Sequence, residues 1–284
     1  MTAERRCEVC DSSSRTQLHQ LNGCRIVRCK HCGLVFVAER PSPEQLLSLY
    51  DESYYEDPSA VGYGGYGEAE ERKRRHDRGL LAELERLRAP GDLLELGCAY
   101  GYFLDEARQR GWRVRGVEPS EHAVGYARER LKLDVIQGTL TELSAERESV
   151  DAVVLWDVIE HLPDPRRTIE TAAAWLRPGG VLALSTGNIG SLSARLHGAD
   201  WSLMTPPWHQ FYFTRSTLRH LLRRCGLEVI RIRGDGSVAV DPTSPNPRIR
   251  GWAASLLTRP VVTRAARKLG AGAIMFAFAR KPAA

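Results

Sequence analysis

The sequence lacks the features that would place the protein in or across a membrane. No run approaches the ~20 apolar residues that a membrane-spanning helix needs, and the N-terminal MTAERRCEVC contains no apolar stretch of the kind found in secretory signal peptides. The 284 residues are 43% apolar and 26% charged, which is typical of globular proteins. We therefore expect a cytoplasmic protein with one large domain and a small appendage.

Acidic residues are missing from the C-terminal part of the chain. From Pro242 onward there are eight basic residues and no acidic one. Within this part, residues 252–269 mix apolar and basic side chains, so a peripheral membrane contact with a lipid-linked substrate is one interpretation. We favour packing on the protein with a solvated basic face, because Pro260 interrupts the helical pattern. The net charge of +5 is too small to imply nucleic acid by itself.

A glycine-containing turn between two apolar runs is the most informative motif. Residues 93–104, LLELGCAYGYFL, predict a strand, a tight turn and the start of a helix, as in the first half of a nucleotide-binding βαβ unit. The turn lacks two glycines of the pyrophosphate fingerprint, because Ala99 stands at the second position and Phe103 lies near the third. It suits an adenosine ligand with a small zwitterionic tail, such as S-adenosylmethionine, whose carboxylate can meet backbone N–H groups at a helix N-terminus.

An acidic residue follows at the distance that ribose binding requires. Glu118 ends a second apolar run, VRGVEP, 21 residues after Gly97. A carboxylate at that separation, at the end of the next strand, can accept hydrogen bonds from two ribose hydroxyls. The alternative for both motifs is a plain strand-to-helix turn beside a solvated glutamate.

Four ordered motifs resemble the class I S-adenosylmethionine-dependent methyltransferases. ELGCAYG, VEPS, DAVVLWDVIEHLPDP and LRPGGVLALSTGN follow one another within residues 68–235. The resemblance implies a doubly wound, Rossmann-like seven-stranded sheet, S-adenosylmethionine as cofactor and methyl transfer as the activity. It also implies that the cofactor lies along the carboxyl ends of the strands, and that Gly138-Thr139-Leu140 replaces the acidic residue many members carry after the third strand. The implied cofactor-binding residues are Glu95, Gly97, Ala99, Gly101, Phe103, Glu118, Pro119, Thr139, Leu140, Trp156 and Asp157.

Four cysteines near the N-terminus predict a structural zinc site. Cys7 and Cys10 form one C-x2-C pair, Cys29 and Cys32 form a second, and eighteen residues separate the two pairs. This spacing is typical of a zinc ribbon with four thiolate ligands, which leaves no open position for catalysis. Residues 1–40 are too few to fold without the metal. Two disulfides are the alternative, and a cytoplasmic location disfavours them.

The segment after the cysteines also carries a resemblance. GLVFVAERPSPEQLLSLYDESYY resembles, with the ribbon, a fusion over about residues 5–57 that occurs in bacterial methyltransferases acting on sugars or on cell-envelope and secondary metabolites. The ribbon can bind nucleic acid, clamp a substrate or only stabilise the chain. Residues 41–67 carry Tyr63 and Tyr66 among glycines, which predicts either a lid over the bound cofactor or a flexible linker.

The rest of the chain, residues 68–284, predicts one methyltransferase domain in which strands alternate with helices. Two insertions, at 188–213 and 237–269, are the segments we expect to determine which substrate binds. The strands are expected near 92–97, 113–118, 133–137, 151–156, 180–187, 227–233 and 272–282, and the helices near 68–88, 101–110, 121–131, 165–176 and 214–225.

Candidate general bases lie near the expected acceptor edge. His209 stands in an aromatic part of the first insertion and is the favoured base, with His161 as an alternative and Tyr212 as a helper. A metal held by Asp157, Glu160 and His161 is a further option. We expect Glu160 and His161 to point to different faces of a helix, which argues against that option.

The resulting hypothesis is a methyltransferase that acts on a sugar, glycan precursor or secondary metabolite, at oxygen. One alternative is an RNA methyltransferase whose ribbon grips RNA, and another is a non-catalytic S-adenosylmethionine-binding module. The first 88 residues hold 14 basic and 15 acidic residues, a balance that argues against phosphate binding. The sequence leaves the oligomeric state open.

Overall fold

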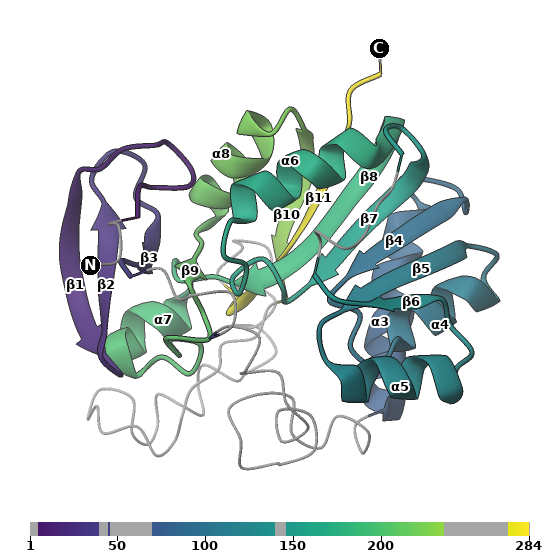
Figure 1. Ribbon diagram of the computed structural model, residues 1–284. Coiled ribbons are helices and arrows are strands. Elements are labelled where there is room, and N and C mark those ends of the chain that lie inside the picture. The colour runs from purple at the N-terminus through teal and green to yellow at the C-terminus, as the bar shows by residue number, and fades with distance from the viewer. Residues whose placement is uncertain (1–4, 40–44, 46–69, 140–145, 236–271, 284) are drawn as a thin grey trace, which may run out of the picture. The chain divides into compact units, whose positions relative to one another are not determined.

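The computed structural model describes residues 5–39, 45, 70–139, 146–235 and 272–283 (Figure 1). The chain divides into two compact units. The cysteine-bearing unit comprises Met1–Pro41, Asp157–Ile169 and Leu184–Ala279, and the glycine-loop unit comprises Ser42–Trp156, Glu170–Ala183 and Arg280–Ala284. Four of the predicted features lie outside the described residues: Tyr63, Tyr66, Leu140 and the insertion at 237–269.

Four strands of the glycine-loop unit pair in parallel. β4 (Asp92–Leu96) lies between β5 (Arg113–Glu118) and β7 (Val150–Trp156), and β5 pairs in turn with β6 (Val135–Gln137). Every residue of β7 is buried. A continuously apolar strand of this kind is expected where both faces of a parallel sheet are covered.

Three further strands complete a seven-stranded sheet. They are β8 (Leu176–Gly187), β10 (Glu228–Gly234) and β11 (Ile274–Arg280), and the strand order is β10-β11-β8-β7-β4-β5-β6. This order confirms the predicted doubly wound fold. β8 begins earlier than the expected position near 180, because its start pairs with the segment after β11: the N–H of Gly179 donates to the carbonyl oxygen of Lys281 at 3.0 Å.

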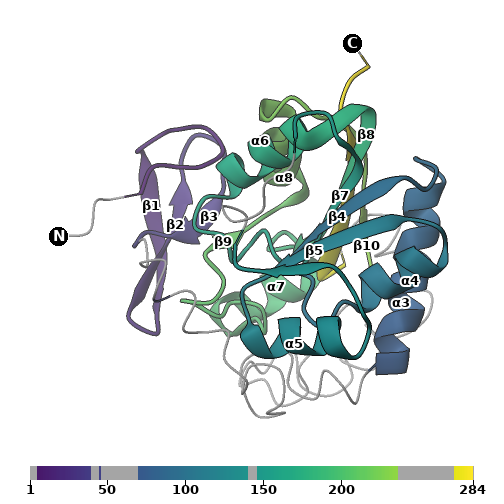
Figure 2. The same cartoon turned by 45° about the vertical axis from the view of Figure 1, so that its right-hand side comes forward.

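Three helices of the glycine-loop unit pack together (Figures 1 and 2). α3 (Glu70–Glu85) precedes the first parallel strand, α4 (Tyr102–Gln109) follows the glycine turn, and α5 (Glu121–Glu129) follows β5. Arg74 of α3 donates to a carboxylate oxygen of Asp105 in α4 at 2.9 Å. The helix that begins at the glycine turn is therefore fixed from two sides, by the sheet and by α3.

The cysteine-bearing unit contains a separate four-stranded sheet. β1 (Arg15–Leu21), β2 (Cys24–Cys29) and β3 (Val35–Val37) form an antiparallel meander, and the fourth strand is β9 (Phe211–Tyr212), which comes from the first insertion. Figures 1 and 2 show the N-terminal strands in purple beside this later, green segment. We call the part of the chain that holds the four cysteines and β1 to β3 the cysteine-rich module. Its sheet is completed by residues more than 170 positions later in the chain.

The remaining helices surround the first insertion or follow it. α6 (Pro165–Trp175) spans the boundary of the two units, α7 (Leu192–His197) and a short 3-10 turn (Gly198–Asp200) lie within the insertion, and α8 (Arg215–Arg224) follows it. Across the ranges that the structure describes, no helix has the length and apolar character needed to cross a membrane.

Candidate active site

The glycine turn adopts a backbone conformation that its sequence explains only in part. Gly97, Ala99 and Gly101 all have positive φ angles, of 70°, 49° and 81°. Glycine adopts this left-handed conformation without cost, whereas alanine pays for it. The strained Ala99 is retained at the point where the turn reaches Glu118, and strain of this kind is often found at ligand sites.

Glu118 is held by the backbone of the turn. Its carboxylate accepts hydrogen bonds from the N–H groups of Ala99, at 2.9 Å, and Ser120, at 3.0 Å. The side chain is only 3% exposed. These two bonds fix the orientation of the carboxylate at the end of β5. The turn and the acidic residue therefore form one unit, as their spacing predicts.

Glu95 is a second buried carboxylate, near the end of the neighbouring strand β4. Its Oε2 atom has no hydrogen-bond partner among the described residues. Burial, followed by the nearby charge of Asp77, holds the pKa of Glu95 well above its ordinary value. A buried carboxyl group without a partner is costly, and a ligand ammonium group would satisfy it. The residues of this unit therefore fit a zwitterionic ligand.

The other predicted cofactor residues of this unit are distributed as follows. Phe103 and Trp156 lie side by side, with ring centroids 5.3 Å apart, and both are buried. Pro119 is partly buried next to Glu118, whereas Thr139 is exposed after the end of β6. This contact joins the first turn of α4 to the carboxyl end of β7 through two apolar rings.

Asp157 follows Trp156 along the chain and begins the next segment of the cysteine-bearing unit. It has a positive φ of 54°. Ser185 stabilises this conformation, because its Oγ accepts from the Asp157 N–H at 2.9 Å and donates to Asp157 Oδ1 at 2.7 Å. Ser185 was not predicted from the sequence, although a serine inside the apolar run LALSTGN was a signal that could have pointed to it.

Three candidate side chains of this unit come together in space. Glu160, His161 and His209 each present one donor atom, and these atoms all lie within 4.8 Å of one another. The rings of the two histidines are 4.6 Å apart between centroids. The prediction that Glu160 and His161 lie on a helix and diverge was wrong. They occupy a turn before α6, and the turn directs both toward His209.

The two histidine rings are oriented by backbone carbonyl groups. His161 Nδ1 lies 3.1 Å from the carbonyl oxygen of Trp208, and His209 Nδ1 lies 2.7 Å from that of Leu203. A carbonyl oxygen only accepts, so each Nδ1 carries the proton and each Nε2 carries the lone pair in the neutral ring. Burial lowers the pKa of His161 well below its usual value and lowers that of His209 too.

Glu160 responds to burial in the opposite direction. Burial, with a further contribution from the charge of Asp157, raises its pKa to about 8. Its backbone carbonyl accepts from the N–H groups of Gln210, at 2.7 Å, and Phe211, at 3.2 Å. The turn that carries Glu160 is therefore tied to the segment that carries His209.

Tyr212, the predicted helper, belongs to an apolar core. It is 3% exposed and packs with Ile26, Val35 and Trp201. Its hydroxyl has no hydrogen-bond partner among the described residues, and burial raises its pKa. Its ring centroid lies 6.4 Å from that of His209.

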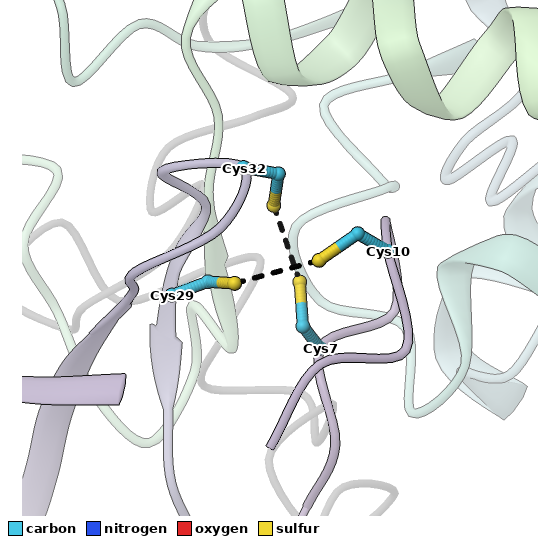
Figure 3. Close-up of side chains that lie close together, drawn as sticks. All are labelled: Cys7, Cys10, Cys29 and Cys32. Atoms are coloured by element: carbon cyan, nitrogen blue, oxygen red, sulfur yellow. Dashed lines mark hydrogen bonds between the residues drawn. The ribbon is translucent and has the colours of Figure 1, made fainter. Parts of the chain in front are cut away.

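The four predicted cysteine ligands converge on one point (Figure 3). Cys7 and Cys32 are 3.4 Å apart between sulfur atoms, Cys10 and Cys29 are 3.5 Å apart, and all four sulfurs lie within 4.8 Å of one another. All four thiols are free. A tetrahedral Zn²⁺ with Zn–S distances of about 2.3 Å would place the sulfurs about 3.8 Å apart, so the cluster fits a four-thiolate zinc ion.

The cysteine loops are attached to other parts of their unit. Asp11, one residue after the first C-x2-C pair, forms ion pairs with Arg166 at the start of α6 and Arg224 at the end of α8. Arg5, just before that pair, is buried, donates to the Gln210 side chain and lies over the Phe211 ring. Sequence reasoning missed Arg5, because nothing in the N-terminal sequence indicates that this cation lies beside β9.

Comparison with known proteins identifies the sheet-forming part of the chain. A family described as a methyltransferase domain matches residues 69–232. A probable S-adenosylmethionine-dependent methyltransferase of Mycolicibacterium smegmatis is 37% identical over 157 residues, which is 55% of this chain and 59% of the relative. The chain thus spans less than two thirds of that relative.

Two further proteins extend the comparison. A ubiquinone biosynthesis O-methyltransferase of Azoarcus sp. is 30% identical over 63% of this chain and 78% of its own length. The crystal structure of an S-adenosylmethionine-dependent methyltransferase from Archaeoglobus fulgidus matches 76% of this chain and all of its own chain, with a TM-score of 0.52 and 20% identity. This structural likeness shows the fold.

Proposed function

The chain belongs to the methyltransferase domain family, and we propose that it transfers a methyl group from S-adenosylmethionine to a hydroxyl oxygen of a small-molecule acceptor. Sugars, glycan precursors and secondary metabolites are the acceptor classes we favour. The family match over residues 69–232 supports the reaction. Relatives named as ubiquinone biosynthesis O-methyltransferases support oxygen as the methylated atom.

The observation that carries the cofactor assignment is the pair of buried carboxylates in the glycine-loop unit. Glu118 is held by backbone N–H groups at the end of β5, where a carboxylate is placed to accept hydrogen bonds from ribose hydroxyls. Glu95 has a buried oxygen without a partner among the described residues, which an ammonium group would satisfy. S-adenosylmethionine carries both an adenosine ribose and a methionine ammonium group, so one ligand matches the two sites.

Methyl transfer from a sulfonium needs alignment more than it needs acid–base help. The acceptor oxygen attacks the methyl carbon in line with the breaking carbon–sulfur bond, and positioning supplies much of the acceleration. A hydroxyl acceptor must also lose its proton. We assign that activation to the cluster of Glu160, His161 and His209, because its two imidazoles present lone pairs in fixed orientations. His209 is the member on which we expect turnover to depend most.

The cysteine cluster is proposed to hold a structural zinc ion. Its four sulfurs would fill the tetrahedral coordination of the metal and leave no position for substrate. Its place in the molecule supports a structural role, because β3, the strand that follows it, pairs with β9. β9 comes shortly after His209, a member of the cluster of Glu160, His161 and His209, which we call the acceptor cluster. We do not assign it to nucleic-acid binding.

The acceptor class can be tested with methyl-labelled S-adenosylmethionine and fractionated metabolite extracts. We expect label in a small molecule as an acid-stable methyl ether. His209→Ala should abolish the transfer, whereas the control His220→Ala, an exposed residue of α8, should retain it. Label in RNA, or on nitrogen or carbon of a small molecule, would contradict the proposal.

A further inference from the structure

We propose that Glu160, His161 and His209 form a second metal site, which binds a divalent transition-metal ion through two imidazole nitrogens and one carboxylate oxygen. The three donor atoms lie within 4.8 Å of one another. The site is separate from the cysteine cluster, because none of the four cysteines belongs to it.

Each imidazole is oriented as a metal ligand requires. Nδ1 of His161 and Nδ1 of His209 donate to the carbonyl oxygens of Trp208 and Leu203. Metal-binding histidines usually donate their other ring N–H to a carbonyl or carboxylate in this way, since the bond fixes both the tautomer and the ring plane. The remaining ring nitrogen, Nε2, then carries the lone pair that binds a cation.

Glu160 supplies the second, independent observation. The residue is 4% exposed, and its Oε2 atom is buried without a hydrogen-bond partner among the described residues. An unsatisfied buried carboxylate oxygen costs free energy unless a cation or donor meets it. A metal ion between the three donor atoms would provide that cation and balance the negative charge.

The site is built from two segments that the backbone holds together. The Glu160 carbonyl accepts from the N–H groups of Gln210 and Phe211, directly after His209. The His209 N–H donates to the Thr205 carbonyl at 3.1 Å, which closes its own loop. The three donors are therefore preorganised before any ion binds, which lowers the cost of forming the site.

The donor set selects the class of metal. Two imidazoles and one carboxylate suit Zn²⁺, Fe²⁺, Co²⁺ and similar ions, whereas Mg²⁺ and Ca²⁺ prefer oxygen ligands. Three protein ligands leave at least one coordination position open. The histidines are only partly buried, so the site is not sealed from outside ligands.

The chemical role of the ion rests on the proposed function. With both imidazole lone pairs on the ion, the cluster would activate the acceptor through the metal and not as a base: a hydroxyl bound at the open position would become more acidic and release its proton to water. Its oxygen would then form a bond to the methyl carbon while the carbon–sulfur bond breaks. The products are a methyl ether and the neutral thioether S-adenosylhomocysteine, so charge and atoms balance.

The test is a titration of the full-length protein with Co²⁺ after its cysteine cluster has been loaded with Zn²⁺. We expect about one further Co²⁺ per chain, with visible bands of a nitrogen and oxygen site and no thiolate charge-transfer band. Glu160→Gln, which keeps the side-chain volume, should weaken the affinity at least about tenfold. His209→Ala should abolish binding, and the exposed control His220→Ala should bind like the wild type.

Two results would overturn the inference: no Co²⁺ uptake by the wild type beyond the cysteine cluster, or equal uptake by wild type, Glu160→Gln and His209→Ala. Affinity for S-adenosylmethionine, measured on each variant, shows whether it is folded. Methyl transfer at the full rate without this metal would overturn the chemical role given to the ion and leave the proposed function intact. Metal binding without transfer to any hydroxyl would overturn the proposed function and leave the metal site intact.

Discussion

The backbone N–H of Val37 donates to the carbonyl oxygen of Gln210 at 2.9 Å, which joins the cysteine-rich module to the residue after His209. The pairing of Val35 with Tyr212 continues the same ladder. The proposed zinc ion, by folding the N-terminal strands, would therefore also fix β9 and, through it, the segment that carries His209. The ribbon acts as a scaffold for catalysis in this account.

Removing one zinc ligand should therefore impair methyl transfer more than cofactor binding. Cys29→Ser is expected to lower the zinc content and the activity, because β2 and β3 lose the metal that orders the loops at their ends. Calorimetric affinity for S-adenosylmethionine should change little, since Glu95 and Glu118, on which we expect it to depend most, lie in the glycine-loop unit. Cys24→Ser is the matched control, because Cys24 begins the same strand but is outside the cluster. Full activity in zinc-free Cys29→Ser would contradict this role.

A methyl group added under the glycine turn should disturb cofactor binding. A Cβ atom at Gly116 would lie 2.7 Å from both Cys98 Sγ and Leu104 Cδ1, so Gly116→Ala must displace these two side chains, one from the turn and one from α4. Overpacking of this kind costs about 1–3 kcal/mol, and we expect weaker S-adenosylmethionine binding as well. Gly125→Ala in α5 meets no atom within 4 Å and should stabilise the protein by about 0.5–1 kcal/mol. Denaturant unfolding and calorimetry measure both effects, and equal behaviour of the two variants would contradict the packing argument.

Asp151 should contribute stability that depends on pH. Burial opposes its ionisation, but hydrogen bonds and charges from Arg88 and Arg177, with the Asp92 N–H, outweigh burial and lower its pKa. A carboxyl group with a lowered pKa stabilises the fold fully above its unfolded pKa of about 3.9, and this stability is lost as the pH falls through the folded pKa.

The variant Asp151→Asn should therefore cost about 1–3 kcal/mol at neutral pH and progressively less at acid pH. Unfolding curves at several pH values check this, with Asp134→Asn as a control whose ion pair with Arg115 is exposed. A difference between wild type and Asp151→Asn that does not shrink on acidification would disprove the assignment.

The parts of the fold that could be predicted from the sequence depend on local patterns. The glycine turn and Glu118 belong to one βαβ unit, so their spacing along the chain fixes their distance in space. The meeting of the two cysteine pairs could also be predicted, because each C-x2-C turn presents two sulfurs to one point, and all four sulfurs do come together. In both cases the prediction depends on the spacing of residues in a short stretch of the chain.

His209 and His161 were candidates from the sequence, but their meeting with Glu160 could not be predicted, since it depends on contacts between segments far apart in the chain. His209 meets Glu160 because the N–H groups of Gln210 and Phe211 donate to the Glu160 carbonyl, and β9, a strand of two residues, also pairs with β3. The helix expected at His161 was wrong for a local reason. Asp164 caps α6 by accepting from the Arg167 N–H at 2.9 Å, and Pro165 is the first helical residue. The helix therefore starts only after His161.

The central claim is that cofactor binding and acceptor activation use different residues, and a parallel calorimetric titration tests it most directly. S-adenosylmethionine is titrated into wild type, Glu118→Ala and His209→Ala. We predict that Glu118→Ala loses most of the affinity, because ribose hydroxyls lose their acceptor, and that His209→Ala binds like the wild type. Unchanged affinity in Glu118→Ala, or an equal loss in both variants, would contradict the account.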